Sequence, residues 1–206
     1  CSSDLNGYDF SGIEAKGTYV DNAFRGSIVS TDPNFNFSYN GLFSFVPDFT
    51  DESQYDFIAE VGNINLAAIN VDRSNPVSQL SLVASANVKN TGDGYVNGKI
   101  DISNVVYKGP KGIYNIGDIN IKSLNSSDVY TAILRSPFAE VEYSGPAPIY
   151  HFAGKFADMV LAHNMDNWFV RDTSRVYADG LYNFNMQTFN TMPVFEILNK
   201  DYYISD

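Results

Sequence analysis

The segment DPNFNFSYNGLFSFV, from Asp32 to Val46, alternates between aromatic and polar side chains. Its odd positions carry five aromatic rings and one glycine, namely Phe35, Phe37, Tyr39, Gly41, Phe43 and Phe45. Its even positions are polar except for Leu42 and Val46. Successive side chains of a strand point to opposite faces, so this period of two predicts a β-strand with one aromatic face. That face needs an apolar cover, which a second sheet, a helix or a ligand with hydrocarbon chains would supply.

The composition is that of a β-rich globular chain. Of the 206 residues, 44% are hydrophobic and 15% are aromatic, and Phe and Tyr supply nearly all of the aromatic ones. The net charge of −11 repels phosphate backbones, so we expect no nucleic-acid partner. No apolar run reaches the length that a membrane-spanning helix requires.

The same alternation recurs along most of the chain. Residues 16–20 and 24–30 flank Asp21-Asn22, a pair that tolerates left-handed backbone, and this pattern predicts a β-hairpin. Asp32-Pro33 predicts the next turn, and Gly109 to Gly112 predicts a later one. Further strands are expected over residues 55–61, 80–88, 96–106, 119–121, 130–134, 139–143 and 182–188. Short strands joined by turns favour an antiparallel sheet.

Two short phrases occur twice in the same order. FRGSI at 24–28 resembles VNGKI at 96–100, and GNINLAAIN at 62–70 resembles GDINIKSLN at 117–125. Recurrence of this kind predicts a repeating β-meander, in which each unit buries its apolar face by stacking on its neighbours.

The periodicity changes after Pro146 and Pro148. Apolar residues then recur at helical spacing, which predicts one amphipathic helix over residues 149–168. We expect this helix to cover the apolar face of the sheet through Phe152, Phe156, Met159 and Val160.

No constellation for catalysis or metal binding stands out in the sequence. The only histidines, His151 and His163, are twelve positions apart in the expected helix and cannot share a metal ion as close helical neighbours do. No nucleophile elbow or nucleotide-binding loop is present. We therefore expect no catalytic residue, metal or cofactor, and an enzyme such as a glycan hydrolase is the least favoured class.

Cys1 is the single cysteine, so an internal disulfide cannot form. A first-position cysteine followed by Ser2 and Ser3 is typical of a processed bacterial lipoprotein, in which Cys1 would be lipidated. The other interpretation is a sequence that starts inside a longer protein.

The order of these phrases resembles one known family. KGTYVDNAFRGSIVSTDPNFNFSYNGLFSF at 16–45, followed by YDFIAEVGNINLAAINVDR at 55–73, is similar to the repeating units of the AsmA-like translocation and assembly module proteins of the TamB type. The segment VNGKIDISNV at 96–105 resembles the next strand of such a unit, and the tail from Phe184 to Ser205 resembles a further phrase.

The resemblance implies a long, curved, taco-like antiparallel sheet built from repeats, with an apolar groove. It implies passage of phospholipid acyl chains through the periplasm of a Gram-negative cell and support of outer-membrane biogenesis. It also implies an outer-membrane barrel partner that is reached through other regions. If Cys1 is the mature N-terminus, a standalone outer-membrane lipoprotein is expected instead.

These observations predict a mainly β, non-catalytic protein. We expect a β-repeat sheet over 1–145, the covering helix over 146–170 and return strands of the next repeat over 171–206. The predicted groove lining consists of Phe35, Phe37, Tyr39, Phe43, Phe45, Phe57, Leu80, Leu82, Ile100 and Ile102. The alternative is a surface lipoprotein with a β-sandwich fold, which would bury the same aromatic residues against a second sheet and act as an adhesin-like interaction module.

Overall fold

The structure is a computed structural model, and it describes residues 3–5, 7–46, 52–72, 76–92, 95–126, 129–149 and 179–191. Within these residues the protein is mainly β, as the alternation predicted. Cys1 lies outside the described residues. So does the expected covering helix beyond residue 149, with Phe152, Phe156, Met159 and Val160.

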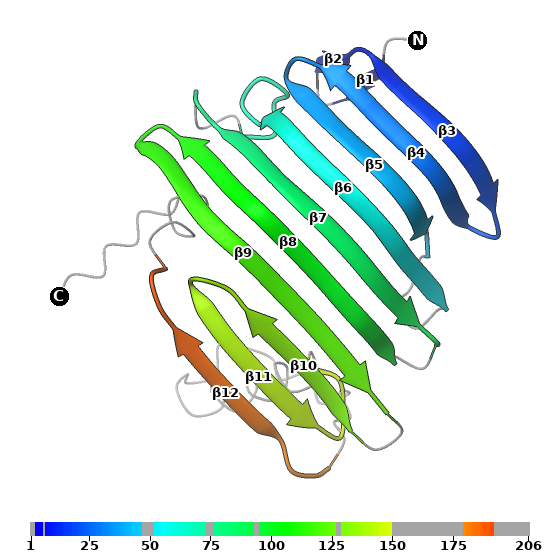
Figure 1. Cartoon of the computed structure of the whole chain (residues 1–206), viewed down its shortest axis with the longest axis vertical. Coiled ribbons are helices and arrows are strands. Elements are labelled where there is room, and N and C mark those ends of the chain that lie inside the picture. Colours follow the sequence, from blue (N-terminus) through cyan, green and yellow to red (C-terminus); the bar gives the residue numbers. More distant parts are fainter. Residues whose placement is uncertain are drawn as a thin grey trace, which may run out of the picture.

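Ten strands form one open antiparallel sheet, in which neighbours in sequence are neighbours in space from β3 to β12 (Figure 1). The strands are β3 (Ile13–Val20), β4 (Ala23–Asp32), β5 (Phe35–Ser44), β6 (Ser53–Asn65), β7 (Gln79–Asn90), β8 (Val96–Gly109), β9 (Gly112–Asn125), β10 (Tyr130–Arg135), β11 (Ala139–Gly145) and β12 (Asn183–Thr188). Because every connection joins adjacent antiparallel strands, the sheet is a simple meander. β12 pairs with β11, so the return strand expected after residue 171 belongs to this same sheet.

The local turn chemistry explains the first connections. Asp21 and Asn22 both adopt positive φ angles, 50° and 57°, and connect β3 to β4 as the sequence predicted. Two consecutive residues of this kind match the right-handed twist of a tight hairpin. Pro33 and Asn34 form the turn between β4 and β5, and Pro110 and Lys111 form the turn between β8 and β9.

The two repeated phrases do not fall at a constant interval in the sheet. Gly26 lies in β4 and Gly98 in β8, four strands later, whereas Gly62 lies in β6 and Gly117 in β9, only three strands later. Strands β6 and β9 also run in opposite directions. Gly62 and Gly117 instead share a local role, since each lies at a shift in pairing register. The described residues therefore do not form copies of one unit with a fixed number of strands.

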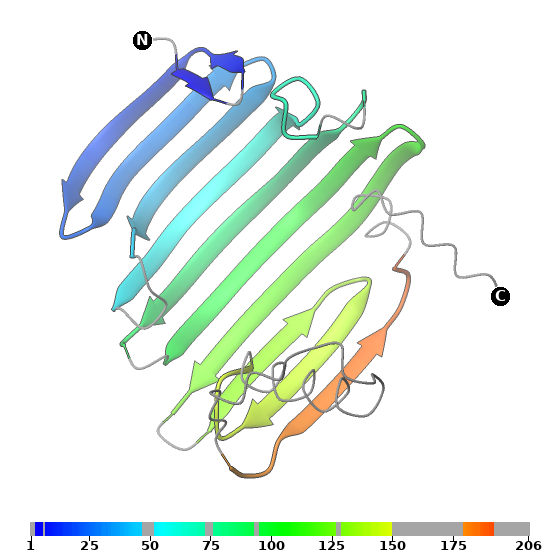
Figure 2. The ribbon, with the colours of Figure 1, turned by 180° about the vertical axis from the view of Figure 1, so that it is seen from behind.

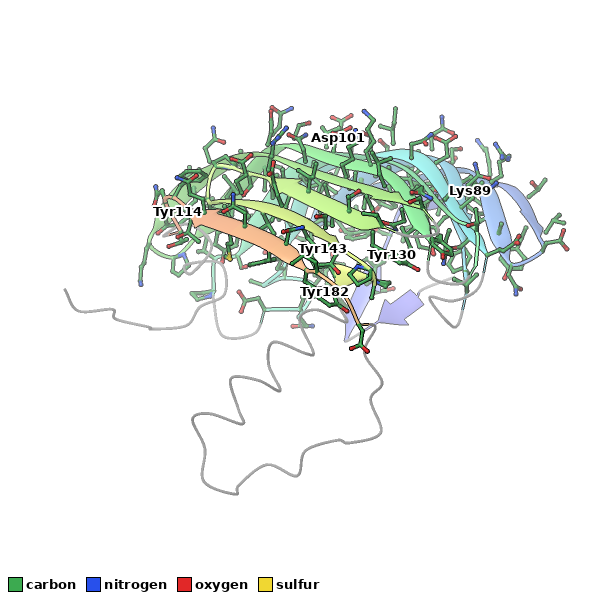
Figure 3. All side chains as sticks on the ribbon, turned by 90° about the horizontal axis from the view of Figure 1, so that it is seen from below. Lys89, Asp101, Tyr114, Tyr130, Tyr143 and Tyr182 are labelled. Atoms are coloured by element: carbon green, nitrogen blue, oxygen red, sulfur yellow. The ribbon has the colours of Figure 1, made fainter. Side chains whose placement is uncertain are left out.

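The sheet is bowed when viewed along its lower edge (Figure 3). Tyr130, Tyr143 and Tyr182 lie on the inner side of the bow, and Asp101 lies on the outer side. The remaining described sheet is a small pair of strands, β1 (Ser3–Leu5) and β2 (Tyr8–Phe10), which crosses one end of the large sheet (Figure 2). The β-sandwich alternative requires a second large layer, and the described strands do not form one.

A compact apolar cluster lies at one end of β7–β9. Its buried members are Val105, Tyr107 and Ile116. The Tyr107 hydroxyl lies 3.2 Å from the Ser78 hydroxyl, so both buried groups are satisfied. The partly buried residues that pack around this cluster are Leu80, Leu82, Ile102, Tyr114, Ile119 and Phe138. At this end of the sheet, the protein's own side chains therefore cover one another.

A row of glycines brings three neighbouring strands close together. Gly17 in β3 pairs with Gly26 in β4, which pairs with Gly41 in β5. A Cβ atom added to Gly26 would lie 2.2 Å from the Lys16 carbonyl oxygen and 2.5 Å from the Gly17 Cα. Because these are backbone atoms, the strands would have to separate to accept a larger residue.

We therefore expect Gly26→Ala to lower the free energy of unfolding by roughly 1–3 kcal/mol, measured by urea denaturation. Gly62→Ala is the matched control, because the nearest atom to its added Cβ is the side-chain Oδ1 of Asn36, at 2.6 Å. That side chain can move aside, so the control should change stability by no more than about 0.5 kcal/mol. Equal stability of the two variants would contradict the close approach of the strands.

The apolar face of the sheet

Cross-strand partners in an antiparallel sheet share a face, so the register assigns each side chain to one side. One continuous row starts at Ile28 in β4 and passes through Tyr39, Ala59, Ala84 and Ile102. A second row on the same side pairs Phe24 with Phe43 and then with Tyr55 and Val88. We call the side that carries these two rows the apolar face, and the opposite side the polar face.

The apolar face brings together nine of the ten predicted lining residues. These are Phe35, Phe37, Tyr39 and Phe43 from β5, Phe57 from β6, Leu80 and Leu82 from β7, and Ile100 and Ile102 from β8. The tenth residue, Phe45, lies just beyond the end of β5 and is 53% exposed. Its ring still contacts Phe43 and Tyr19, at centroid distances of 4.9 and 6.1 Å. All ten therefore belong to one connected surface.

Charge is segregated between the two faces. Every lysine and arginine in strands β3–β12 points to the polar face: Lys16, Arg25, Lys89, Lys99, Lys108, Lys122 and Arg135. The acidic residues of these strands lie on the same side, namely Glu14, Asp56, Glu60, Asp101, Asp118, Glu140 and Glu142. The single exception is Asp32, at the end of β4. Among the described strands, the apolar face thus carries no basic side chain.

Neighbouring rings on the apolar face pack against one another rather than under a second layer. Phe35 and Phe37 lie 5.3 Å apart between ring centroids, Phe43 and Tyr55 lie 5.0 Å apart, and Tyr39 and Phe57 lie 5.3 Å apart. Of the ten predicted lining residues only Tyr39 is buried, at 9% exposure, and the others stay partly or largely exposed. Aromatic pairs at these distances stabilise a sheet laterally while leaving outer ring surface open.

The β1–β2 pair covers one end of the apolar face. The Phe10 ring meets the Phe35 ring edge-on at a centroid distance of 5.2 Å. Asp32 holds this contact in place, because its carboxylate accepts hydrogen bonds from the Tyr8 hydroxyl at 2.8 Å and from the Ser11 backbone N–H at 2.9 Å. The Ser11 hydroxyl and the Asn34 backbone N–H donate two more, at 2.9 and 2.8 Å.

Asp32 remains ionised although it is 1% exposed. Burial alone would raise the pKa of its carboxyl group. The hydrogen bonds from Ser11, Tyr8 and Asn34 stabilise the charged form more strongly, and the pKa falls to about 2. The Asp32 carboxylate, which is the one charge of strands β3–β12 on the apolar face, is therefore fully engaged in hydrogen bonds that hold the β1–β2 pair and the turn after β4 in place.

Sequence reasoning missed several residues that the register adds to this face. They include Phe24, Tyr55, Val61, Val88, Ile119, Leu134, Phe184 and Met186. Most lie in strands that the alternation located, and matching their parity to β5 through an antiparallel pairing would have found them. Phe24 gave a weaker signal, because the other same-face positions of its strand include Gly26, Ser30 and Asp32.

The polar face carries a shallow depression, and its polar groups are largely paired with one another. A shallow depression of about 330 Å³ opens among Asn40, Asp56, Asn87, Lys99 and Asp101. Its two carboxylates already accept hydrogen bonds from Asn87 at 3.3 Å and from Asn120 at 3.0 Å, and Lys99 pairs with Asp101 at 2.9 Å. Across the described residues, no group of three or more acidic, histidine or cysteine side chains is placed to hold a metal ion. Nor does any helix among them have the length and apolar character needed to cross a membrane.

Comparisons of the chain with protein-family models, with curated proteins and with solved structures gave no match. The description of the protein therefore comes from its fold and from the chemistry of its two faces. Its described residues form one open antiparallel β-sheet of ten strands, with one apolar face and one charged face.

The Asp32 contacts generate a pH-dependent prediction. Asp32→Asn would place an amide against two backbone N–H donors, and we expect the free energy of unfolding to fall by roughly 1–3 kcal/mol at neutral pH. Because the pKa of Asp32 in the folded protein, about 2, is below its ordinary value of 3.8, the unfolded chain takes up the proton first on acidification. The stability difference from wild type should be complete above about pH 4 and shrink as the pH falls from 4 toward 2.

Asp9→Asn is the control, since it removes an exposed carboxylate from the same β1–β2 pair. Urea denaturation between pH 2 and 7 provides the measurement. A difference between wild type and Asp32→Asn that stays constant down to pH 2 would show that the carboxylate is not held in its charged form.

Proposed function

We propose that the apolar face binds the acyl chains of phospholipids, and that the protein is a non-catalytic lipid-binding segment. The observation that carries the proposal is the segregation of charge over ten strands, with no second layer of described strands over the rings. An apolar sheet surface in water is unfavourable unless something apolar covers it. A hydrocarbon chain satisfies this need without requiring any specific polar partner.

The shape and size of the face suit such a ligand. Its rings and aliphatic side chains continue from β5 through β9, so a chain laid across the strands meets apolar surface throughout. Each buried methylene contributes about 0.8 kcal/mol, so a long acyl chain gains affinity from many small contacts. The polar face stays in water, which keeps the segment soluble while its other face holds lipid.

We further propose the setting that the sequence resemblance implies. The protein would be a segment of a TamB-type, AsmA-like protein in the periplasm of a Gram-negative bacterium, acting in lipid transport for outer-membrane biogenesis. The open meander supports this proposal, because a sheet that grows strand by strand can be extended into a longer groove. An outer-membrane barrel protein remains the partner expected through other regions.

The proposal is tested by a charge on the central aromatic strand. Phe37 is partly exposed and lies on the apolar face, so a carboxylate in Phe37→Asp can reach water. We expect the variant to fold, with a loss of about 1–1.5 kcal/mol of stability from lost ring contacts. It should lose most of the co-purifying phospholipid that native mass spectrometry detects on the wild-type protein.

Asn36→Asp is the matched control, because it adds the same charge one residue away on the exposed polar face. It should retain both stability and lipid. If Phe37→Asp unfolds outright, the ring is part of a closed core and the lipid-binding face is wrong. Wild-type protein that never carries phospholipid would also contradict the proposal.

A further inference from the structure

Tyr39 differs from the other residues of the apolar face. It lies in the middle of β5 and is 9% exposed, and its hydroxyl is the one buried side-chain group of the described residues without a hydrogen-bond partner. Other buried tyrosines are satisfied. The Tyr107 hydroxyl pairs with that of Ser78, and the Tyr143 hydroxyl donates to the Ala147 carbonyl oxygen. A buried hydroxyl without a partner is unfavourable, and folded proteins rarely keep one without a role.

The surroundings of the Tyr39 side chain are apolar. The rings of Phe57 and Phe24 lie 5.3 and 6.3 Å from its ring, tilted by 40° and 36°. Its partners on the adjacent strands are Ile28 and Ala59. None of these side chains can accept a hydrogen bond from the hydroxyl. Both phenylalanine rings are partly exposed, so a ligand on the apolar face can contact them beside Tyr39.

The apolar environment also selects the kind of group that the hydroxyl can meet. Burial raises the pKa of the Tyr39 phenol above its ordinary value, so the hydroxyl keeps its proton and acts as a donor. A charged phosphate on this face would meet no basic side chain of strands β3–β12, because all of these point to the polar face. The fitting ligand group is an uncharged acceptor attached to hydrocarbon.

We propose that the Tyr39 hydroxyl donates a hydrogen bond to an ester carbonyl of a lipid whose acyl chain lies on the apolar face. This inference rests on the proposed function and adds a specificity to it. Ester carbonyls are the uncharged acceptors nearest to the acyl chains of a diacyl phospholipid. The hydroxyl therefore fixes the position of the lipid along β5, whereas the rings around it provide only non-directional apolar contact. An ether-linked lipid with the same chains and headgroup lacks the carbonyl and loses this contact.

The test compares two lipids that differ only in this linkage. Dipalmitoyl-phosphatidylethanolamine and its di-O-hexadecyl ether analogue are offered together, and native mass spectrometry measures how much of each the protein retains. Wild-type protein should prefer the ester lipid by about three- to tenfold, the worth of one neutral hydrogen bond. Tyr39→Phe should bind both lipids equally and hold the ether lipid as well as wild type does.

Tyr55→Phe is the matched control, since it removes a hydroxyl from the same face one strand away, and it should keep the ester preference. Thermal unfolding of the empty proteins gives the second measurement. Tyr39→Phe removes an unpaired polar group and should unfold at the same temperature as wild type or higher.

The possible outcomes separate the two proposals. If Tyr39→Phe keeps the ester preference, or unfolds at a clearly lower temperature, the inference about Tyr39 is wrong while lipid binding stands. If wild type shows no ester preference but binds both lipids, the inference also fails alone. If wild type binds neither lipid, the proposed function fails and takes the inference with it.

Discussion

The constraint on which the structure depends is the period-two separation of charge across one continuous sheet. With the exception of Asp32, the charged residues of strands β3–β12 lie on the polar face, and this holds through nine successive antiparallel pairings from β3 to β12. A slip of one residue in any pairing would place charges among the aromatic rings, so the pattern strongly specifies the register. The same pattern leaves a broad apolar surface that the described strands cover only in part, and the function must account for that surface.

Different described residues cover the two ends of the apolar face. The β1–β2 pair closes over Phe35 through Phe10 and is fastened by the hydrogen bonds to Asp32. Near β7–β9 the cluster around Tyr107 is compact and internally satisfied. Between these ends, most rings of β5 and β6 contact their neighbours laterally and keep part of their surface open. The lipid-binding face that we propose would need fixed ends and an accessible middle, and the described strands provide both.

Local features of the sequence were predictable, and features that join distant strands were not. The aromatic alternation from Phe35 to Phe43 and the Asp21-Asn22 turn depend on a few adjacent residues, and the structure confirms both the strand and the hairpin. Asp32 appeared to be only a turn residue, because Tyr8 and Ser11, which donate to it, are 24 and 21 positions away. The repeated phrases predicted a repeating β-meander, and in the sheet they mark glycines at close strand contacts and register shifts, at unequal intervals. Which of the ten predicted lining residues is most buried could not be foreseen either, since Tyr39 is flanked by rings from β4 and β6.

Two buried tyrosines on the apolar face differ in how their hydroxyl groups are satisfied. Tyr107 is 1% exposed, and its hydroxyl is paired within the protein, so that part of the face behaves as an ordinary core. Tyr39 is also buried, but the described residues supply no acceptor for its hydroxyl, and the neighbouring rings of Phe24 and Phe57 remain partly exposed. Backbone pairing on both sides holds β5, which carries Tyr39, and β8, which carries Tyr107. Under the function that we propose, a lipid that brings its own acceptor would form the hydrogen bond that the Tyr39 hydroxyl does not make within the described residues.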